Sequence, residues 1–310
     1  MNEELFRWAT LIGIAHSGVR LATPYLFASL GEMVGQRSGV LNLGVEGMML
    51  MGAFSAYYAL LQTGNPWLGV LAAIIVGALM GLLMAVISVT MQAEQGISGI
   101  GLSLFGLGLS SLLLKVLVGA PRSISAFQPL HIPILSDIPV VGEIFFDHNI
   151  LIYFAYLCVP LSLFLLNRTT FGLKIRAVGQ NPAAADSLGV RVNAVRYATV
   201  IFGGAMSGIA GASLSIGMLS IFQENMTNGI GFIAVALVYF GGWRPVGVLL
   251  GALLFSTVSA FQLWMQVLGV PLPSDIAVML PYLLTIIVLA VGGRQVRQPA
   301  ALTKPYERGE

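Results

Sequence analysis

The sequence predicts an all-α, polytopic membrane protein: a helical bundle with about eight to ten transmembrane helices. Of its 310 residues, 57% are hydrophobic and only 9% are charged, whereas about 25% of residues are charged in a soluble domain. A soluble globule of this size could not cover its surface with so few charges. The apolar residues also form long continuous runs without strand-like alternation, which favours helices over a barrel.

Nine apolar segments are candidate spans, because about 20 apolar residues cross the hydrocarbon core of a bilayer. They cover residues 9–30, 40–61, 67–90, 97–117, 150–166, 198–220, 230–243, 245–266 and 276–292. The second segment carries Asn42 and Glu46, and the seventh is short, so the expected count is a range. Together the segments predict a single transmembrane domain over residues 1–310.

The distribution of Lys and Arg predicts the orientation, because cytoplasmic loops are enriched in these residues. Residues 167–197 hold five Lys or Arg against the single acid Asp186, and the tail after residue 293 holds four. We therefore expect both on the cytoplasmic side. Loop 118–149 is then external, and counting back through four spans places the N-terminus outside as well.

Residues 96–108 and 229–241 resemble each other. Identities fall at Gly96/Gly229, Ile97/Ile230, Ile100/Ile233, Leu104/Leu237 and Gly108/Gly241. The two copies would run in opposite directions, as in transporters with inverted repeats, where the substrate path lies at the repeat interface. Chance is the alternative, since Gly, Ile and Leu are abundant in every membrane helix.

The segment from residue 38 to residue 53 places Asn42, Glu46 and several glycines at the head of a hydrophobic span. An intramembrane carboxylate costs about 2.5 kcal/mol or more, and glycine weakens a helix by about 1 kcal/mol relative to alanine. Such residues persist where they line a wet cavity, have a partner or occupy broken helix. We interpret the segment as bordering a translocation path. The alternative places Glu46 among the lipid headgroups, where it costs little.

The predicted cytoplasmic loop carries the signals of a short helix. Asn181 is a good N-cap, Pro182 suits the first helical position and Gly189 suits the left-handed stop. A helix of about two turns is marginal in water, so it must dock. Its small side chains, the alanines at 183–185, fit a shallow groove on another protein. The alternative is a loop lying on headgroups, with Arg176 facing anionic lipid.

The sequence shows no catalytic or metal-binding set, so we expect neither an enzyme nor a cofactor. His16 stands alone in the first span, and His131 and His148 lack the spacing of metal ligands. There is no phosphate-binding loop, nucleophile elbow or metalloprotease motif. A net charge of +2 argues against a nucleic-acid partner.

Three segments, 38–53, 172–189 and 241–252, resemble the inner-membrane permeases of binding-protein-dependent ABC importers of the ribose, branched-chain amino acid and nucleoside type. The resemblance covers about residues 10–295. Within this branch, the run Gly-Val-Leu-Asn-Leu-Gly-Val-Glu-Gly-Met-Met from Gly39 looks like the nucleoside-uptake subgroup. Sugar permeases tend to carry a Gly-Gly-Ile-Asp-Leu-Ser-Val-Gly pattern there.

The resemblance implies a permease subunit that forms the path of an ATP-driven importer of nucleosides in the inner or plasma membrane. Its implied partners are an ATP-binding subunit, a second permease subunit, an extracytoplasmic substrate-binding protein or lipoprotein, and membrane lipid. It places Asn42, Glu46 and Ser98 on or near the path. It makes residues 179–189 the helix that couples to the ATP-binding subunit. The implied coupling residues are Arg176, Gly179, Asn181, Pro182, Ala184, Ala185 and Gly189.

Two alternative functions stay open at this point. One is an ion-gradient-driven secondary transporter that uses Glu46 or His16 as its proton or sodium group. The other is an importer permease for ribose-type sugars. The capped cytoplasmic helix favours an ATP-driven importer over the secondary transporter, because a secondary carrier has no cytoplasmic ATPase to engage.

Overall fold

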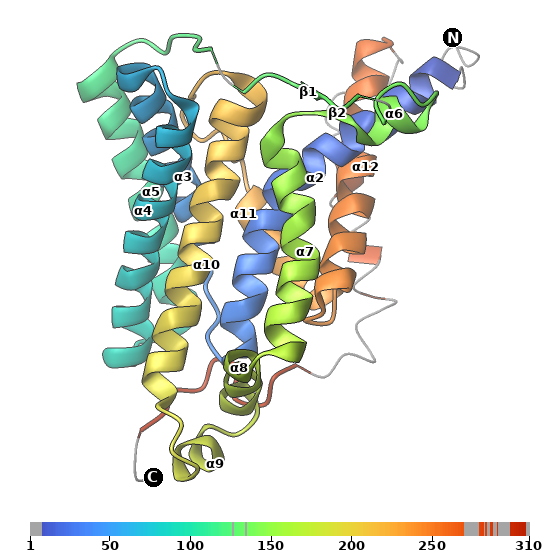
Figure 1. Ribbon diagram of the computed structural model, residues 1–310. Helices are drawn as coiled ribbons and strands as arrows, with labels where there is room; N and C mark the ends of the chain where they lie inside the picture. Colours follow the sequence, from blue (N-terminus) through green and yellow to red (C-terminus); the bar gives the residue numbers. More distant parts are fainter. Residues whose placement is uncertain are drawn as a thin grey trace.

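The structure, a computed structural model, describes residues 8–125, 127–133, 135–269, 279–281, 283, 286–287, 290 and 298–307. In these residues the chain forms a bundle of long helices with a small two-stranded sheet at one end (Figure 1). The predicted class, an α-helical membrane protein, is confirmed by the apolar helices described below.

The elements follow one another along the chain as a series of helices interrupted once by the sheet. They are α2 (Trp8–Arg37), α3 (Val45–Thr63), α4 (Pro66–Ala85), η1 (Val86–Thr90), α5 (Gln95–Leu113), η2 (Leu114–Val118), β1 (Leu130–His131), α6 (Val141–Phe145), β2 (Asp147–His148), α7 (Ile150–Arg168), α8 (Thr170–Gln180), α9 (Pro182–Ser187), α10 (Val192–Leu214), η3 (Ser215–Leu219), α11 (Ile230–Phe240) and α12 (Pro245–Val267). The η segments are π-helical turns that extend α4, α5 and α10.

Five helices of the described part are long and apolar enough to cross a membrane, which makes this a multi-pass membrane protein. They are Pro66–Thr90, Gln95–Val118, Ile150–Arg168, Val192–Leu219 and Pro245–Val267. The predicted spans 9–30 and 40–61 correspond to α2 and α3, which are more polar, and 230–243 corresponds to the short α11. The predicted span 276–292 lies largely outside the described residues.

Helix α10 lies at the centre of the bundle, with 78% of its most apolar window buried. It crosses α4 closely, because both helices present glycine at the contact. A Cβ atom built on Gly77 would lie 2.3 Å from the carbonyl oxygen of Gly204, and the reverse distance is the same. Gly81 and Gly208, each four residues further along its helix, also lie in this contact, and glycines at this spacing permit close helix crossings.

The two ends of the bundle differ in what they carry. Helices α8 and α9 lie at the same end as the C-terminal residues, whereas the start of α2 and the connection between α5 and α7 lie at the opposite end (Figure 1). The backbone N–H of Ala301 donates to the Gly179 carbonyl at 2.9 Å, which ties the tail to α8. The two basic segments therefore share one end, and their assignment to the cytoplasm stays a prediction.

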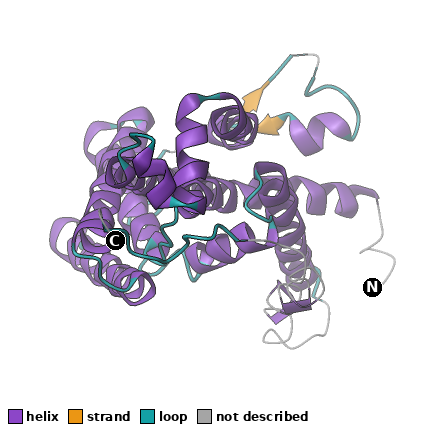
Figure 2. Cartoon of the chain, turned by 90° about the horizontal axis from the view of Figure 1, so that it is seen from below, coloured by secondary structure: helices purple, strands orange, loops and turns teal. Residues whose placement is uncertain are grey.

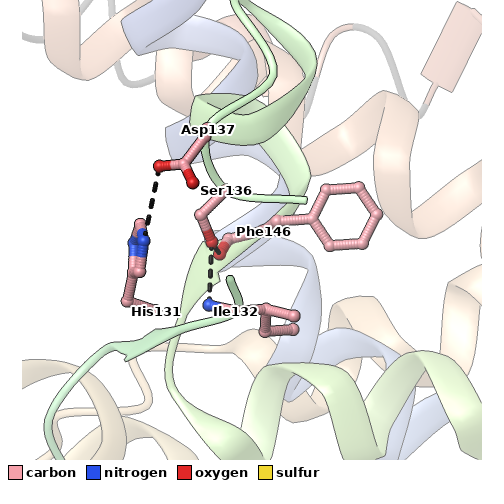
Figure 3. A network of polar contacts seen from close by, with 5 residues as sticks. All are labelled: His131, Ile132, Ser136, Asp137 and Phe146. Carbon is pink, nitrogen blue, oxygen red and sulfur yellow. Dashed lines mark hydrogen bonds and ion pairs between the residues drawn. The ribbon is translucent and has the colours of Figure 1, made fainter. Parts of the chain in front are cut away.

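The connection between α5 and α7 forms a small lobe. Viewed along the bundle, its strands and α6 lie to one side of the helices (Figure 2). The strands pair antiparallel, His131 opposite Asp147. Inside the lobe the Ser136 hydroxyl accepts from the Ile132 N–H at 2.9 Å and donates to the Phe146 carbonyl at 2.5 Å (Figure 3).

Two imidazoles lie where the lobe meets α2. The rings of His16 and His148 stack with centroids 4.4 Å apart. Burial lowers the pKa of His148 to about 4, because the charged ring would lose its hydration. His148 is therefore neutral at physiological pH. Among the described residues, no group of three or more His, Cys, Asp or Glu is placed to hold a metal ion.

Replacing Gly204 with leucine should destabilise the bundle. The new side chain would collide with the backbone of Gly77, and overpacking of this kind costs about 1–3 kcal/mol or more. The measurement is the thermal unfolding midpoint of the purified protein in detergent. The matched control is Gly101→Leu on α5, where a Cβ atom has no neighbour within 4 Å. Equal midpoints for the two variants would contradict the close α4–α10 crossing.

Candidate functional site

The chain between α2 and α3 is not helical, although sequence periodicity predicts a span from residue 40. After Arg37 it turns at Gly39, whose φ of +96° suits glycine, and then rises along the bundle to α3 (Figure 1). Helix α3 begins at Val45. A Cβ atom on Gly47 would lie 2.6 Å from the Leu102 carbonyl oxygen, so the first turn of α3 packs against the middle of α5. We call residues 38–44 the re-entrant segment.

Buried side chains satisfy the backbone of this segment. The N–H of Leu41 donates to Gln95 Oε1 at 2.8 Å, and the N–H of Asn42 donates to Glu32 Oε1 at 2.9 Å. The Asn42 side chain in turn accepts from the Gly44 N–H at 2.8 Å. Non-helical backbone at membrane depth is tolerated only where protein or water satisfies it. Asn42, 3% exposed, therefore acts here on its own backbone.

Glu46 joins the beginning of α3 to the beginning of α11. Its Oε1 accepts from the Thr227 hydroxyl at 2.6 Å and from the Gly229 N–H at 2.8 Å, and its Oε2 accepts from the Gly231 N–H at 2.6 Å. The first N–H groups of a helix lack intrahelical partners and carry partial positive charge. The carboxylate therefore caps α11 and is buried within the bundle.

A second carboxylate caps α5 in the same way. Glu94 accepts from the backbone N–H groups of Gly96, at 3.0 Å, and Ile97, at 2.5 Å. These two bonds hold the pKa of Glu94 below its usual value. Glu94 is exposed at the end of a helix, whereas Glu46 is 6% exposed, so the same chemistry is used at the surface and in the interior.

A cavity of about 300 Å³ lies beside Glu46. Its lining comes from α3, α5, α11 and the loop before α11: Glu46, Leu50, Ile100, Ser103, Leu104, Leu107, Asn225, Asn228, Gly229 and Phe232. Two exposed amides, Asn225 and Asn228, and an aromatic ring, Phe232, therefore line the same cavity. Both asparagines have positive φ, 56° and 40°, which asparagine tolerates better than most residues.

Of the three predicted path residues, only Glu46 lines this cavity. Asn42 is buried behind it, and the hydroxyl of Ser98 donates to the Glu94 carbonyl within its own turn at 2.6 Å. Sequence reasoning missed Asn225, Asn228 and Phe232. The polar run from Gln223 to Asn228, between two apolar helices, is the signal that could have found them.

The predicted start and end of the short helix after residue 180, which is α9, are confirmed. Asn181 Oδ1 accepts from the Ala184 N–H at 3.0 Å, Pro182 is the first residue of α9, and Gly189 has a φ of +82°. Helix α9 lies at the end of the bundle, below α8 (Figure 1). Leu188 follows it and is 85% exposed, an unusual position for a leucine at the tip of a loop.

The predicted outward face of alanines is wrong in one residue. Ala183 and Ala184 are exposed, but Ala185 is 3% exposed and packs in the main apolar core. A helix repeats every 3.6 residues, so three consecutive side chains cannot share one face. Ala185 is the residue that docks α9 on its own chain.

Two other predicted coupling residues make contacts with the rest of the chain. A Cβ atom on Gly179 would lie 2.0 Å from the Arg37 carbonyl oxygen, so glycine lets α8 pack against the end of α2. Arg176 is partly exposed and has a buried Nε without a hydrogen-bond partner. The exposed residues at this tip, which are the candidates for contact with a partner, include Asn181, Ala184, Leu188 and Gly189.

A family model described as branched-chain amino acid transport system / permease component matches residues 14–289. No solved structure matches the chain.

Three characterised or named relatives cover most of the chain. The Haloferax volcanii "Putative glucose ABC transporter permease protein TsgC13" is 39% identical, over 96% of this chain and 98% of its own length. The guanosine ABC transporter permease protein NupQ of Bacillus subtilis is 35% identical, over 93% and 94%. The nucleoside ABC transporter permease protein NupC of Lactococcus lactis is 37% identical, over 87% and 89%.

Replacing Glu46 with glutamine should loosen the start of α11. The amide keeps one acceptor oxygen, but its NH2 group replaces the other oxygen and meets either the Gly229 or the Gly231 N–H; an unsatisfied buried donor costs about 1–3 kcal/mol. Hydrogen–deuterium exchange at residues 227–231 should therefore rise. Glu94→Gln is the control, because water can replace its lost bond. Unchanged exchange in the Glu46 variant would show that the cap does not hold this helix.

Proposed function

The chain belongs to the permease-component family of branched-chain amino acid transport systems, and we propose that it forms the path of an ATP-driven importer for uncharged nucleosides. As a permease component of an ABC transporter it is a membrane subunit, and ATP hydrolysis belongs to a partner subunit. The family implies an ATP-binding subunit and a substrate-binding protein. We add a second permease chain to this assembly, and place the assembly in the inner or plasma membrane.

We propose eight to ten membrane crossings. Helices α2 and α3 supply two beyond the five long apolar helices, because they pack around the buried α10 and α2 has a length of about 45 Å. Their polar residues meet protein, so low hydropathy does not exclude them from the membrane. Helix α11 and the segment 276–292 would complete the count.

We also propose an inverted repeat between residues 96–108 and 229–241. The aligned glycines Gly96 and Gly229 both donate their backbone N–H to a glutamate, Glu94 and Glu46, at 3.0 and 2.8 Å. The start of α5 lies near Leu41, and Trp243, just after α11, donates to Gln36 at 2.8 Å. One helix thus begins near the end of the bundle where the other finishes, as opposed copies require.

The observation that carries the path assignment is the exposed polar loop before α11. Glu224 forms an ion pair of 3.2 Å with Lys115 near the far end of the α5–η2 helix, while Thr227 and Gly229 bind Glu46. Gly47, next to Glu46, packs against Ser103, which is eight residues after the start of α5. Glu46 therefore lies about 12 Å along α5 from its first residue. Exposed, irregular backbone at this depth would be unsatisfied in lipid. It fits a face covered by a second permease chain and by water, which is where a substrate would pass.

The cavity chemistry fits an uncharged, flat solute with hydrogen-bonding edges. The Asn225 and Asn228 amides can each donate and accept, and an aromatic side chain such as Phe232 can stack on a base. No lysine or arginine is among its lining residues, and its one charge is the carboxylate of Glu46. A nucleoside meets these conditions, whereas a nucleotide would bring its phosphate toward a fixed negative charge.

At the cytoplasmic end we propose that α9 and Leu188 engage the ATP-binding subunit. The exposed Leu188 gives an apolar contact, and Ala184 leaves room for a neighbouring surface. The buried Gly179 and Ala185 would dock this projection on the rest of the chain, and its shape would depend on Arg176, Asn181, Pro182 and Gly189. This arrangement would pass the closure of the ATP-binding subunits to the bundle.

Leu188→Asp should reduce uptake about tenfold or more, since an apolar anchor at a partner interface is worth about 1.4 kcal/mol or more. The measurement is nucleoside uptake by the complete complex, with co-purification of the ATP-binding subunit and membrane abundance of this chain. Leu188→Met is the matched control and should retain activity. If Leu188→Asp transported normally, the tip would lie on lipid headgroups instead of on a partner.

Phe232→Leu should lower the uptake of radiolabelled guanosine about tenfold, because base–aromatic stacking contributes about 1–3 kcal/mol. Phe105→Leu, on an exposed α5 residue outside the cavity lining, is the control. Uptake of glucose and of guanosine monophosphate by the wild-type complex is measured alongside. Transport of glucose in preference to guanosine would identify a sugar importer and contradict the proposed substrate class.

A further inference from the structure

The described C-terminal residues, 298–307, fold back against the end of the bundle where α8 lies. Ala301 and Leu302 are 4% and 5% exposed, and Leu302 packs in the main apolar core. Two turns, closed by the Leu302 N–H to Pro299 carbonyl bond at 3.0 Å and the Lys304 N–H to Ala301 carbonyl bond at 3.2 Å, make this piece compact. We call residues 299–304 the strap.

Backbone hydrogen bonds tie the strap to two other segments of the chain. The N–H of Ala301 donates to the carbonyl of Gly179 on α8 at 2.9 Å, and the N–H of Thr303 donates to the carbonyl of Gly39 at 3.1 Å. Gly39 is the second residue of the re-entrant segment, which ends two residues before Glu46. A Cβ atom on Gly39 would lie 2.9 Å from the Ala301 carbonyl oxygen, so the contact requires glycine there.

A buried arginine fastens the same junction. Arg196, near the start of α10, is 1% exposed. Its Nη1 donates to the Lys304 carbonyl at 3.0 Å and its Nε to the Ser38 carbonyl at 3.3 Å. No described acid forms an ion pair with it. Burying a guanidinium without a counter-charge is costly. We therefore expect Arg196 to have a role that depends on its bonds to these two carbonyls.

We propose that the strap links the coupling loop to the path, and that Arg196 is the positioning residue that holds it. A short, closed piece bonded at Gly179 on one side and at Gly39 on the other transmits a displacement of α8 to the re-entrant segment. Because the segment leads directly into the first turn of α3, which carries Glu46, movement of the coupling loop reaches the cap of α11. The proposal rests on the proposed coupling role of α9.

The test uses the complete importer reconstituted in vesicles, with Ala301→Pro and Arg196→Ala as variants. Proline removes the N–H that binds Gly179, and alanine removes both guanidinium bonds. We expect ATP hydrolysis to persist while guanosine uptake falls about tenfold, a loss within the range of allosteric coupling energies. Lys304→Ala is the matched control, because Arg196 uses only the backbone carbonyl of that residue. Thr303→Gly is a second control, since φ at Thr303 is +64° and glycine keeps the N–H.

Wild-type uptake in both variants would overturn the proposal. So would loss of assembly in both, because the strap would then be a folding element. Leu188→Asp separates this proposal from the one it rests on. If Leu188→Asp abolishes uptake and the strap variants do not, only the strap fails. If Leu188→Asp is also silent, the coupling role of α9 fails with it.

Discussion

The Glu46 carboxylate is the interaction on which the interior of the bundle depends. Three donors from Thr227, Gly229 and Gly231 converge on its two oxygens at the point where α3 and α11 both begin. At a site this buried, an unsatisfied polar group is costly. Interrupting two helices there is tolerable because one buried acid satisfies the donors that the second helix leaves open. The interruption in turn leaves space for the cavity between α3, α5 and α11.

The same need to satisfy buried backbone applies to the segment between the α8 end of the bundle and the cavity. The re-entrant segment begins at Ser38, next to Gly39 and the strap, and ends at Gly44, two residues before Glu46 and the cavity. Seven residues of non-helical backbone thus connect the end of the bundle that carries α8 to the cavity, with Glu32 and Gln95 as their lateral supports. A non-helical connection of this kind can shift without breaking helix hydrogen bonds, which suits a protein that alternates between two states.

Local signals made part of this structure predictable. Long apolar runs gave the spans at α4, α5, α7, α10 and α12, and the cap of α9 involves residues only three apart in sequence. The partner of Glu46 was not predictable, because Thr227 lies 181 residues away and hydropathy carries no information on pairing. The inward turn of Ala185 follows from which side of α9 meets the bundle, and that depends on tertiary packing. Hydropathy does not show that polar residues of α2 and α3, such as Glu32 and Glu46, are buried against other helices.

The central claim, that this chain is a path moved by a partner's ATP hydrolysis, is tested most directly by transport in sealed vesicles. The chain is reconstituted with its ATP-binding subunit, second permease and substrate-binding protein, and guanosine uptake is measured with and without ATP. Uptake should require ATP and should persist when ionophores collapse proton and sodium gradients. Guanosine accumulation by the chain alone, driven by an imposed ion gradient without nucleotide, would contradict it.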